Sequence, residues 1–141
     1  MACPPTYKVV KGKLTNGSGG CLASLKYSNY QGAPVTIRCD PLPTPFEQNM
    51  KVGDLDGGLV YDVGSVKWII LWTTECKVAT KIIPIEGHVV WKDIESILHP
   101  HDSSDKLPLP GGGSFSSEAH IQANGYGSLN LEARIMWSVC N

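Results

Sequence analysis

The chain has 141 residues, of which 12 are basic and 13 acidic, so its formal net charge at pH 7 is −1. Lysine and arginine cluster nowhere along it, which excludes the concentrated positive surface that binding to nucleic acid phosphates requires. The longest apolar runs are far shorter than the roughly 20 residues of a membrane-spanning helix. This length predicts one domain, residues 1–141, with a core that needs neither metal nor disulfide.

The cysteines do not form a metal-binding pattern, because structural zinc sites bring their ligands in close pairs. They are Cys3, Cys21, Cys39, Cys76 and Cys140. Their odd number leaves at least one free thiol or an intermolecular bridge. Buried thiols, together with one or two bridges at most, are the expectation.

The start of the chain and one triplet bear on the compartment. No secretory signal follows Met1, so two origins fit: a cytosolic protein, or a mature secreted chain to which Met1 was added. Asn16-Gly17-Ser18 forms an N-glycosylation sequon in a turn rich in glycine and serine. The sequon slightly favours secretion.

The first part of the chain predicts three short strands, at residues 7–14, 22–27 and 35–39. The segments between them have the Asn, Gly and Ser content of turns. Residues 40–45 contain three prolines, which cannot join a central ladder. The sequence therefore predicts an extended crossover between two sheets at this point.

The middle of the chain begins with a polar turn at residues 51–58 and a short strand at residues 59–63. Residues 66–73 are apolar on both faces, which is typical of a central strand covered on both sides or of a strand with one face at an interface. A strand at residues 76–85 contains Pro84, so we expect it at an edge or with a bulge. Apolar residues at helical spacing predict one short helix at residues 92–98.

The last third predicts a long exposed loop and then a hairpin. Residues 99–114 form the loop, whose length of about 15 residues is usual for functional or disordered loops. Residues 115–139 predict the hairpin, because apolar residues alternate with polar ones and fall at odd positions in both arms. A two-residue turn at Asn124-Gly125 would put the apolar faces on opposite sides, whereas a three-residue loop at residues 124–126 pairs Ile121 with Leu129 and keeps them together.

A hairpin with one apolar face needs a second layer to cover it. The short strands therefore predict an all-β fold, a two-layer antiparallel β-sandwich or flattened barrel of about eight or nine strands. At most one short helix is expected, near residues 92–98.

No pattern of catalytic residues stands out. The sequence lacks a Gly-x-Ser-x-Gly elbow and a glycine-rich phosphate loop. Glycoside hydrolysis needs two carboxylates held across a sugar, and no pair is evident among acidic residues that mostly occupy turns or solvent-facing strand positions. We expect a protein that is not an enzyme and that has no cofactor.

Two groups of residues resemble parts of metal sites. His99 and His101 share one loop, but the proline between them extends the backbone and points the imidazoles apart. Asp54 and Asp56 precede two glycines as in a calcium loop, but the downstream acidic ligand is missing. Solvated loop histidines and a polar turn are the preferred interpretations, so no metal site is predicted.

Aromatic residues are the most suggestive feature for binding. Trp68, Trp72 and Trp137 lie within apolar strands and are expected in the core, whereas Tyr30 and Tyr126 lie in polar turns. An aromatic ring on a rigid loop can stack on a sugar or lie at a lipid headgroup boundary. The predicted ligand-binding residues are Tyr30, Tyr126, Asn124, Asp54 and Asp56.

The leading hypothesis is a non-enzymatic binding protein, lectin-like or defence-type, that recognises glycans through loop residues. One alternative is a membrane-active, pore-forming β-protein, whose exposed aromatic loops would meet lipid. The other is a self-assembling structural protein, a homo-oligomer in which the strand at residues 66–73 contributes to the subunit interface.

Overall fold

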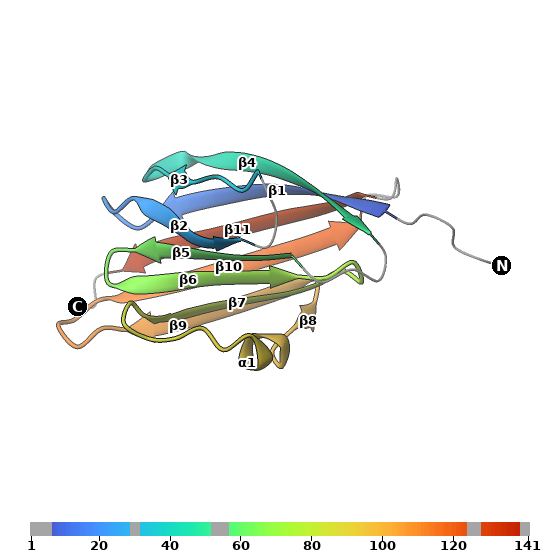
Figure 1. The fold of residues 1–141 in the computed structure, drawn as a ribbon. Helices are drawn as coiled ribbons and strands as arrows, with labels where there is room; N and C mark the ends of the chain where they lie inside the picture. Colours follow the sequence, from blue (N-terminus) through green and yellow to red (C-terminus); the bar gives the residue numbers. More distant parts are fainter. Residues whose placement is uncertain (1–6, 29–31, 52–56, 124–127, 139–141) are drawn as a thin grey trace.

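The computed structural model describes residues 7–28, 32–51, 57–123 and 128–138, which form a β-sandwich of two sheets (Figure 1). The first sheet has the strand order β4 (Asp40–Lys51), β1 (Tyr7–Gly17), β11 (Ser128–Ser138), β10 (Ser114–Ala123) and β9 (Asp102–Pro108). The second has the order β3 (Thr36–Ile37), β2 (Ala23–Ser28), β5 (Gly57–Val63), β6 (Val66–Trp72), β7 (Lys77–Pro84) and β8 (His99–Pro100). The helix is α1 (Trp91–Glu95).

The predicted all-β sandwich with one short helix is confirmed. The described residues form 11 strands, more than the predicted eight or nine. The excess arises because β4 begins in the predicted crossover and because β8 and β9 lie in the predicted loop. The assignment of residues 1–141 to one domain stays a prediction.

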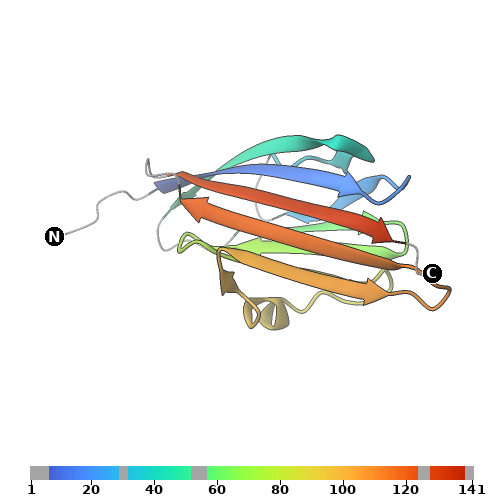
Figure 2. The ribbon, with the colours of Figure 1, turned by 180° about the vertical axis from the view of Figure 1, so that it is seen from behind.

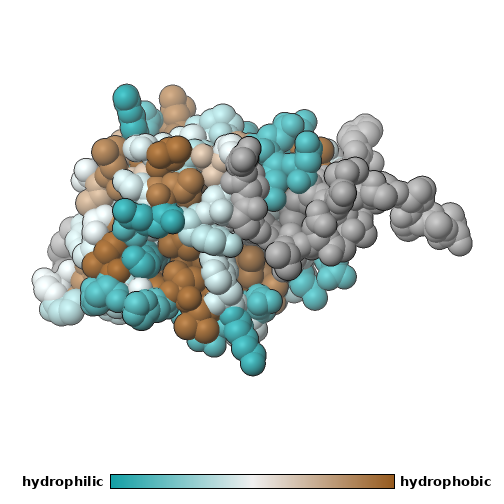
Figure 3. Space-filling model, viewed as in Figure 1, coloured by the Kyte–Doolittle hydropathy of each residue, from teal (hydrophilic) through white to brown (hydrophobic). Residues whose placement is uncertain are grey.

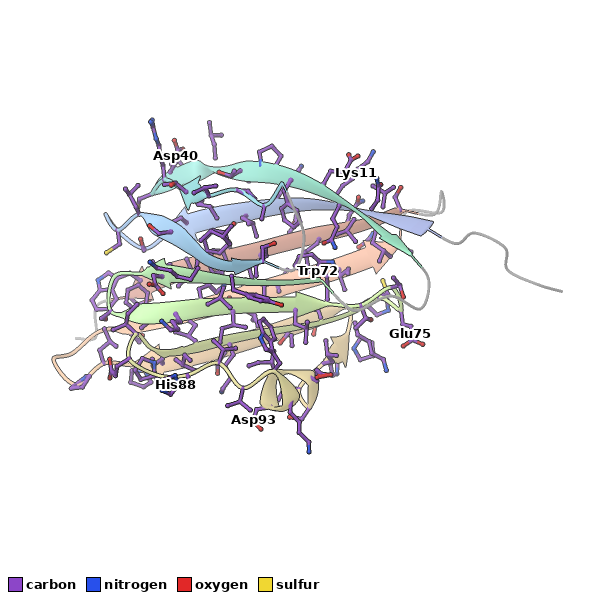
Figure 4. The ribbon with its side chains drawn as sticks, in the orientation of Figure 1. Lys11, Asp40, Trp72, Glu75, His88 and Asp93 are labelled. Atoms are coloured by element: carbon purple, nitrogen blue, oxygen red, sulfur yellow. The ribbon has the colours of Figure 1, made fainter. Side chains whose placement is uncertain are left out.

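The core lies between the sheets, where the apolar positions of each strand face one another. In β11, alternate residues from Leu129 to Ile135 are buried, as the period of two predicted. Trp72 of the opposite sheet is fully buried and lies between the layers (Figure 4). Its ring is 5.7 Å from that of Phe46. Phe46 fills the space above Gly12, where any side chain would overlap its ring.

A second, smaller apolar cluster covers part of the outer face of the six-stranded sheet. Ile69 and Leu71 of β6 point away from the main core and pack with Ile94 of α1. Strand β6 is therefore covered on both sides, as its apolar run predicted. In the self-assembly hypothesis a partner subunit would cover this outer face of β6, but helix α1 of the same chain covers it.

No helix in the described part of the chain is long and apolar enough to cross a membrane.

The predicted register of the closing hairpin is wrong by two residues. Strand β10 pairs Ile121 with Leu131 and Ala123 with Leu129, whereas a three-residue loop pairs Ile121 with Leu129. A shift of two residues keeps every side chain on its face, so the alternation excludes the two-residue turn but cannot distinguish these registers. The loop itself, residues 124–127, lies outside the described residues.

The long loop predicted at residues 99–114 is also wrong, because residues 102–108 form strand β9, paired along its length with β10, and residues 99–100 form β8. Leu107 of β9 packs against the core, whereas its other inward residues, Ser103 and Asp105, are polar and bond the edge of the opposite sheet. The amide of Thr80 in β7 donates to the hydroxyl of Ser103 at 3.1 Å, and the amide of Ile82 donates to the carboxylate of Asp105 at 2.9 Å. These bonds join the two sheets along one side.

The crossover predicted at residues 40–45 is instead the start of the edge strand β4, which pairs with β1 alone. Pro41, Pro43 and Pro45 occupy alternate positions. Alternate residues of a strand direct their backbone groups to the same side, and proline has no N–H to donate. The outer edge of β4 therefore lacks donors at these three positions, a device that hinders pairing with another chain.

One ladder departs from antiparallel order. Strand β1 pairs with β11 in parallel, with Val10 opposite Leu129 and Leu14 opposite Ala133. The first and the last described strands are therefore neighbours at the centre of the five-stranded sheet (Figure 2).

A buried group of polar side chains links the two sheets across the core. The indole N–H of Trp68 donates to the hydroxyl of Ser117 at 2.7 Å. The Ser117 hydroxyl lies 2.6 Å from that of Thr80, which donates to the carbonyl of Ile69 at 3.0 Å. Each of these buried polar atoms thus has a partner, as a low-dielectric interior requires.

The sequon at Asn16 does not suit a glycan in this fold. Asn16 is fully buried, and its amide nitrogen donates to the carbonyls of Cys21 at 2.7 Å and Ile37 at 2.9 Å. Both N–H groups of that amide are used, so a sugar attached there would replace one of these donors and enter the core. The support that the sequon gave to secretion is therefore lost.

Three cysteines are free thiols, Cys21, Cys39 and Cys76, and the other two lie outside the described residues.

Candidate functional site

The outer face of the five-stranded sheet carries three adjoining depressions, which together we call the trough. Their volumes are about 350, 460 and 240 Å³. Glu132 of β11 lines all three, and Lys13 and His120 each line two. The depressions cross strands β4, β1, β11 and β10, on the side of the molecule seen in Figure 2.

Strand alternation places these side chains. In β1, Val10 and Leu14 enter the core, so Lys11 and Lys13 point outward. The same alternation turns the polar residues of β10 and β11 to the outer face. The polar side chains of the trough are Lys11, Lys13, Thr15, Glu47, Glu118, His120, Gln122, Asn130, Glu132 and Arg134.

The charges of the trough balance. Glu47, Glu118 and Glu132 supply three acids, and Lys11, Lys13 and Arg134 supply three bases. Arg134 donates from Nε at 3.1 Å and from Nη2 at 2.8 Å to the same carboxylate oxygen of Glu118 on the adjacent strand. This pair holds the guanidinium and the carboxylate in one geometry on the sheet surface.

Such a surface suits a ligand with many hydroxyl groups. Carboxylates accept hydrogen bonds, guanidinium and ammonium groups donate them, and side-chain amides do both. Because the formal charges cancel, the trough offers no net attraction to a polyanion or a polycation. Pro43 and Pro45 of β4 add apolar surface at one border.

The five predicted ligand-binding residues lie outside the described residues, but the strand ends next to two of them adjoin the trough. Strand β10 ends at Ala123 and β11 begins at Ser128. Gln122 and Asn130 near those ends line the smallest depression. The chain that carries Asn124 and Tyr126 therefore leaves and re-enters the sheet beside the trough. Tyr30, Asp54 and Asp56 fall in the other two undescribed segments between strands.

His99 and His101 turn to different partners. The Nδ1 atom of His99 lies 2.9 Å from the carbonyl of Pro100, and that of His101 lies 3.4 Å from the carbonyl of Ile121. His101 has a φ of 70° at the junction of β8 and β9. Among the described residues, no group of three or more His, Cys, Asp or Glu side chains gathers to hold a metal ion.

The trough residues were not predicted from the sequence. Each is a polar residue at an outward strand position, which is where solvated residues normally occur. The alternation of β10 and β11 did show that Glu118, His120, Glu132 and Arg134 share one face. Their meeting with Lys11 and Lys13 depends on the pairing of β1 with β11, which joins residues more than 100 positions apart.

Comparison with known proteins gives a structural likeness only. No protein-family model matches the chain, and no curated protein matches it. A methionine-substituted form of the Xerocomus chrysenteron lectin XCL aligns with a TM-score of 0.47 and 8% identity, over 94% of this chain and 98% of the lectin. The wild-type lectin aligns with a TM-score of 0.44 and 9% identity, over 94% and 99% of the two chains. These values carry no inference about ligand or activity.

Proposed function

We propose that this protein is a non-enzymatic, lectin-like binding protein and that it recognises neutral glycans in the trough. The observation that carries the proposal is the meeting of three depressions at Glu132, on a face where three acids and three bases cancel. Asn124 and Tyr126 would extend this surface at its β10–β11 end. Tyr30, Asp54 and Asp56 remain proposed contacts from other loops.

The dimensions of the trough favour an oligosaccharide. Neighbouring strands lie about 4.8 Å apart, so a trough across four strands is about 14 Å long. The floor is a sheet surface, which is rigid and needs little ordering when a ligand binds. A chain of a few sugar rings can lie across the strands, with its hydroxyls bonded to side chains from each.

The three carboxylates in the trough raise the question of glycoside hydrolysis, which needs two. The catalytic acid of a glycosidase is kept protonated by a desolvated environment. Glu47 and Glu132 are exposed, whereas the Glu118 side chain is partly exposed and ion-paired with Arg134. None of these carboxylates is desolvated in that way, which supports binding without hydrolysis.

A glycan array tests the proposal. We expect saturable binding of the wild type that free sugar competes, and a loss of at least about tenfold in affinity for Glu132→Ala. Glu86→Ala is the matched control, because Glu86 is an exposed acid after β7, outside the trough. An array without signal, or equal binding of Glu132→Ala and the wild type, would contradict the proposal. Release of reducing sugar would show that the protein is an enzyme.

A further inference from the structure

A pair of aromatic rings, one exposed and one half-buried, lies on the outer face of the six-stranded sheet, opposite to the trough. The rings of Tyr27 in β2 and Trp91 in α1 have centroids 5.2 Å apart and planes tilted by 47°. Tyr27 is 44% exposed, and Val90, which precedes Trp91 in the sequence, is 50% exposed. Figure 3 shows apolar and hydrophilic side chains side by side on this face.

Two irregularities of the sheet build the pair. The register of β2 against β5 shifts between Leu25 and Tyr27, and the bulge leaves Lys26 and Tyr27 both exposed. In β5, Gly58 lets the indole lie directly over the backbone, because a Cβ there would be 3.1 Å from Cη2 and 3.3 Å from Cζ3 of Trp91. The aromatic surface therefore depends on a bulge and a glycine in adjacent strands.

Polar groups border this aromatic surface on one side. Tyr27 pairs with Val60, and Asp62 follows two residues later in β5 on the same face, about 7 Å further along the strand. The Asp62 carboxylate lies 3.3 Å from the ammonium of Lys67 and 3.7 Å from that of Lys26. Because of the bulge, Tyr27 lies in the apolar part of the surface and Lys26 lies at its polar border.

We infer that Tyr27 and Trp91 form a second carbohydrate-binding site, independent of the trough. A pyranose has one apolar face of C–H groups and a rim of hydroxyls. The apolar face would stack on the two rings, as sugars and other amphipathic ligands do on aromatic side chains, and hydroxyls would bond Asp62 and its lysines. A lipid surface fits less well, because three exposed charged residues of α1, Lys92, Asp93 and Glu95, follow Trp91, with Asp93 pointing into solvent (Figure 4).

Nitrogen–proton correlation spectra of the tryptophan indoles test this site. The probes are the methyl pyranosides of glucose, galactose, mannose and N-acetylglucosamine at millimolar concentration, added to the Glu132→Ala protein so that the trough does not contribute. We expect a saturable shift of the Trp91 resonance with at least one probe. The Trp68 resonance is the internal control and should stay in place, because its N–H is buried against Ser117.

Substitutions at Tyr27 complete the test. Tyr27→Ala should lower the sugar affinity measured from the Trp91 resonance by about tenfold. Tyr27→Phe keeps the ring and should retain the wild-type affinity. A Trp91 resonance that no sugar moves, or one that moves equally in Tyr27→Ala, would overturn the inference. So would a shift caused by phosphatidylcholine vesicles and by none of the sugars. The two proposals can fail separately. If sugars shift the Trp91 resonance but Glu132→Ala binds the glycan array as the wild type does, this site is supported and the trough is refuted.

Discussion

At the scale of single residues, the hydroxyl of Ser117 connects the two sheets across the core. Ser117→Ala would leave the indole N–H of Trp68 buried without an acceptor, and the cost of an unpaired buried donor is about 1–3 kcal/mol. We expect the free energy of unfolding, measured by denaturant titration, to fall by that amount. Ser116→Ala is the control, because Ser116 is half-buried and points to the opposite face. An equal loss in both variants would contradict the role of the Trp68 bond.

Tyr61 gives the molecule a dependence on alkaline pH. Burial raises the pKa of Tyr61, whose hydroxyl donates to the carbonyl of Pro34 at 2.7 Å. The folded state thus holds the phenolic proton more tightly than the unfolded chain does. The contribution of Tyr61 to the free energy of unfolding is therefore complete below the unfolded pKa of about 10 and is lost progressively as the pH rises above it.

The comparison with Tyr61→Phe isolates this effect. The difference in unfolding free energy between the wild type and Tyr61→Phe should stay constant up to about pH 9. Above about pH 10 it should move against the wild type, by up to about 1.4 kcal/mol per pH unit. Parallel stability curves across this range would show that Tyr61 ionises freely in the folded protein.

At the scale of elements, strand β9 joins the sheets through side chains. Asp105→Ala removes the acceptor for the Ile82 amide at the edge of β7. We expect hydrogen exchange of that amide to accelerate by at least about tenfold, since an amide bonded to a carboxylate is stabilised by about 1.5–3 kcal/mol. Ser104→Ala is the control, because Ser104 is exposed on the same strand. Unchanged exchange at Ile82 would mean that backbone packing alone closes this side.

The same strand shows why part of the fold was predictable and part was not. Strands β10 and β11 follow from alternating apolar residues, and β6 from a run that is apolar on both faces. Strand β9 was missed because Ser103 and Asp105 face inward, where the pattern expects apolar residues. The hairpin register was missed because a shift of two residues leaves the pattern unchanged.

The candidate sites were less predictable than the strands. Glu132 and Arg134 have no local signature, and they meet Lys13 only through the pairing of β1 with β11. Tyr27 was not distinguished from other strand tyrosines, because the bulge that turns it outward depends on the register against β5. Both sites combine residues that tertiary structure alone brings together.

At the scale of the whole molecule, the two proposed sites lie on opposite faces of the sandwich. Sheets pack about 10 Å apart, so bound sugars would be separated by more than that distance and should bind independently. We expect native mass spectrometry to show two glycans on each wild-type chain at saturation. Glu132→Ala and Tyr27→Ala should each retain one. A single glycan on the wild type would mean that only one of the faces binds.

The parallel pairing of β1 with β11 also determines when the five-stranded sheet can be completed during synthesis. Strands β4 and β1 leave the ribosome early, and β9 and β10 leave it late, but β11 stands between the two pairs and is made after every other described strand. Until it emerges from the exit tunnel, the edges of β1 and β10 that it will bridge stay open. Completion of this sheet is therefore expected to wait for the synthesis of β11, however early β1 and β4 are made.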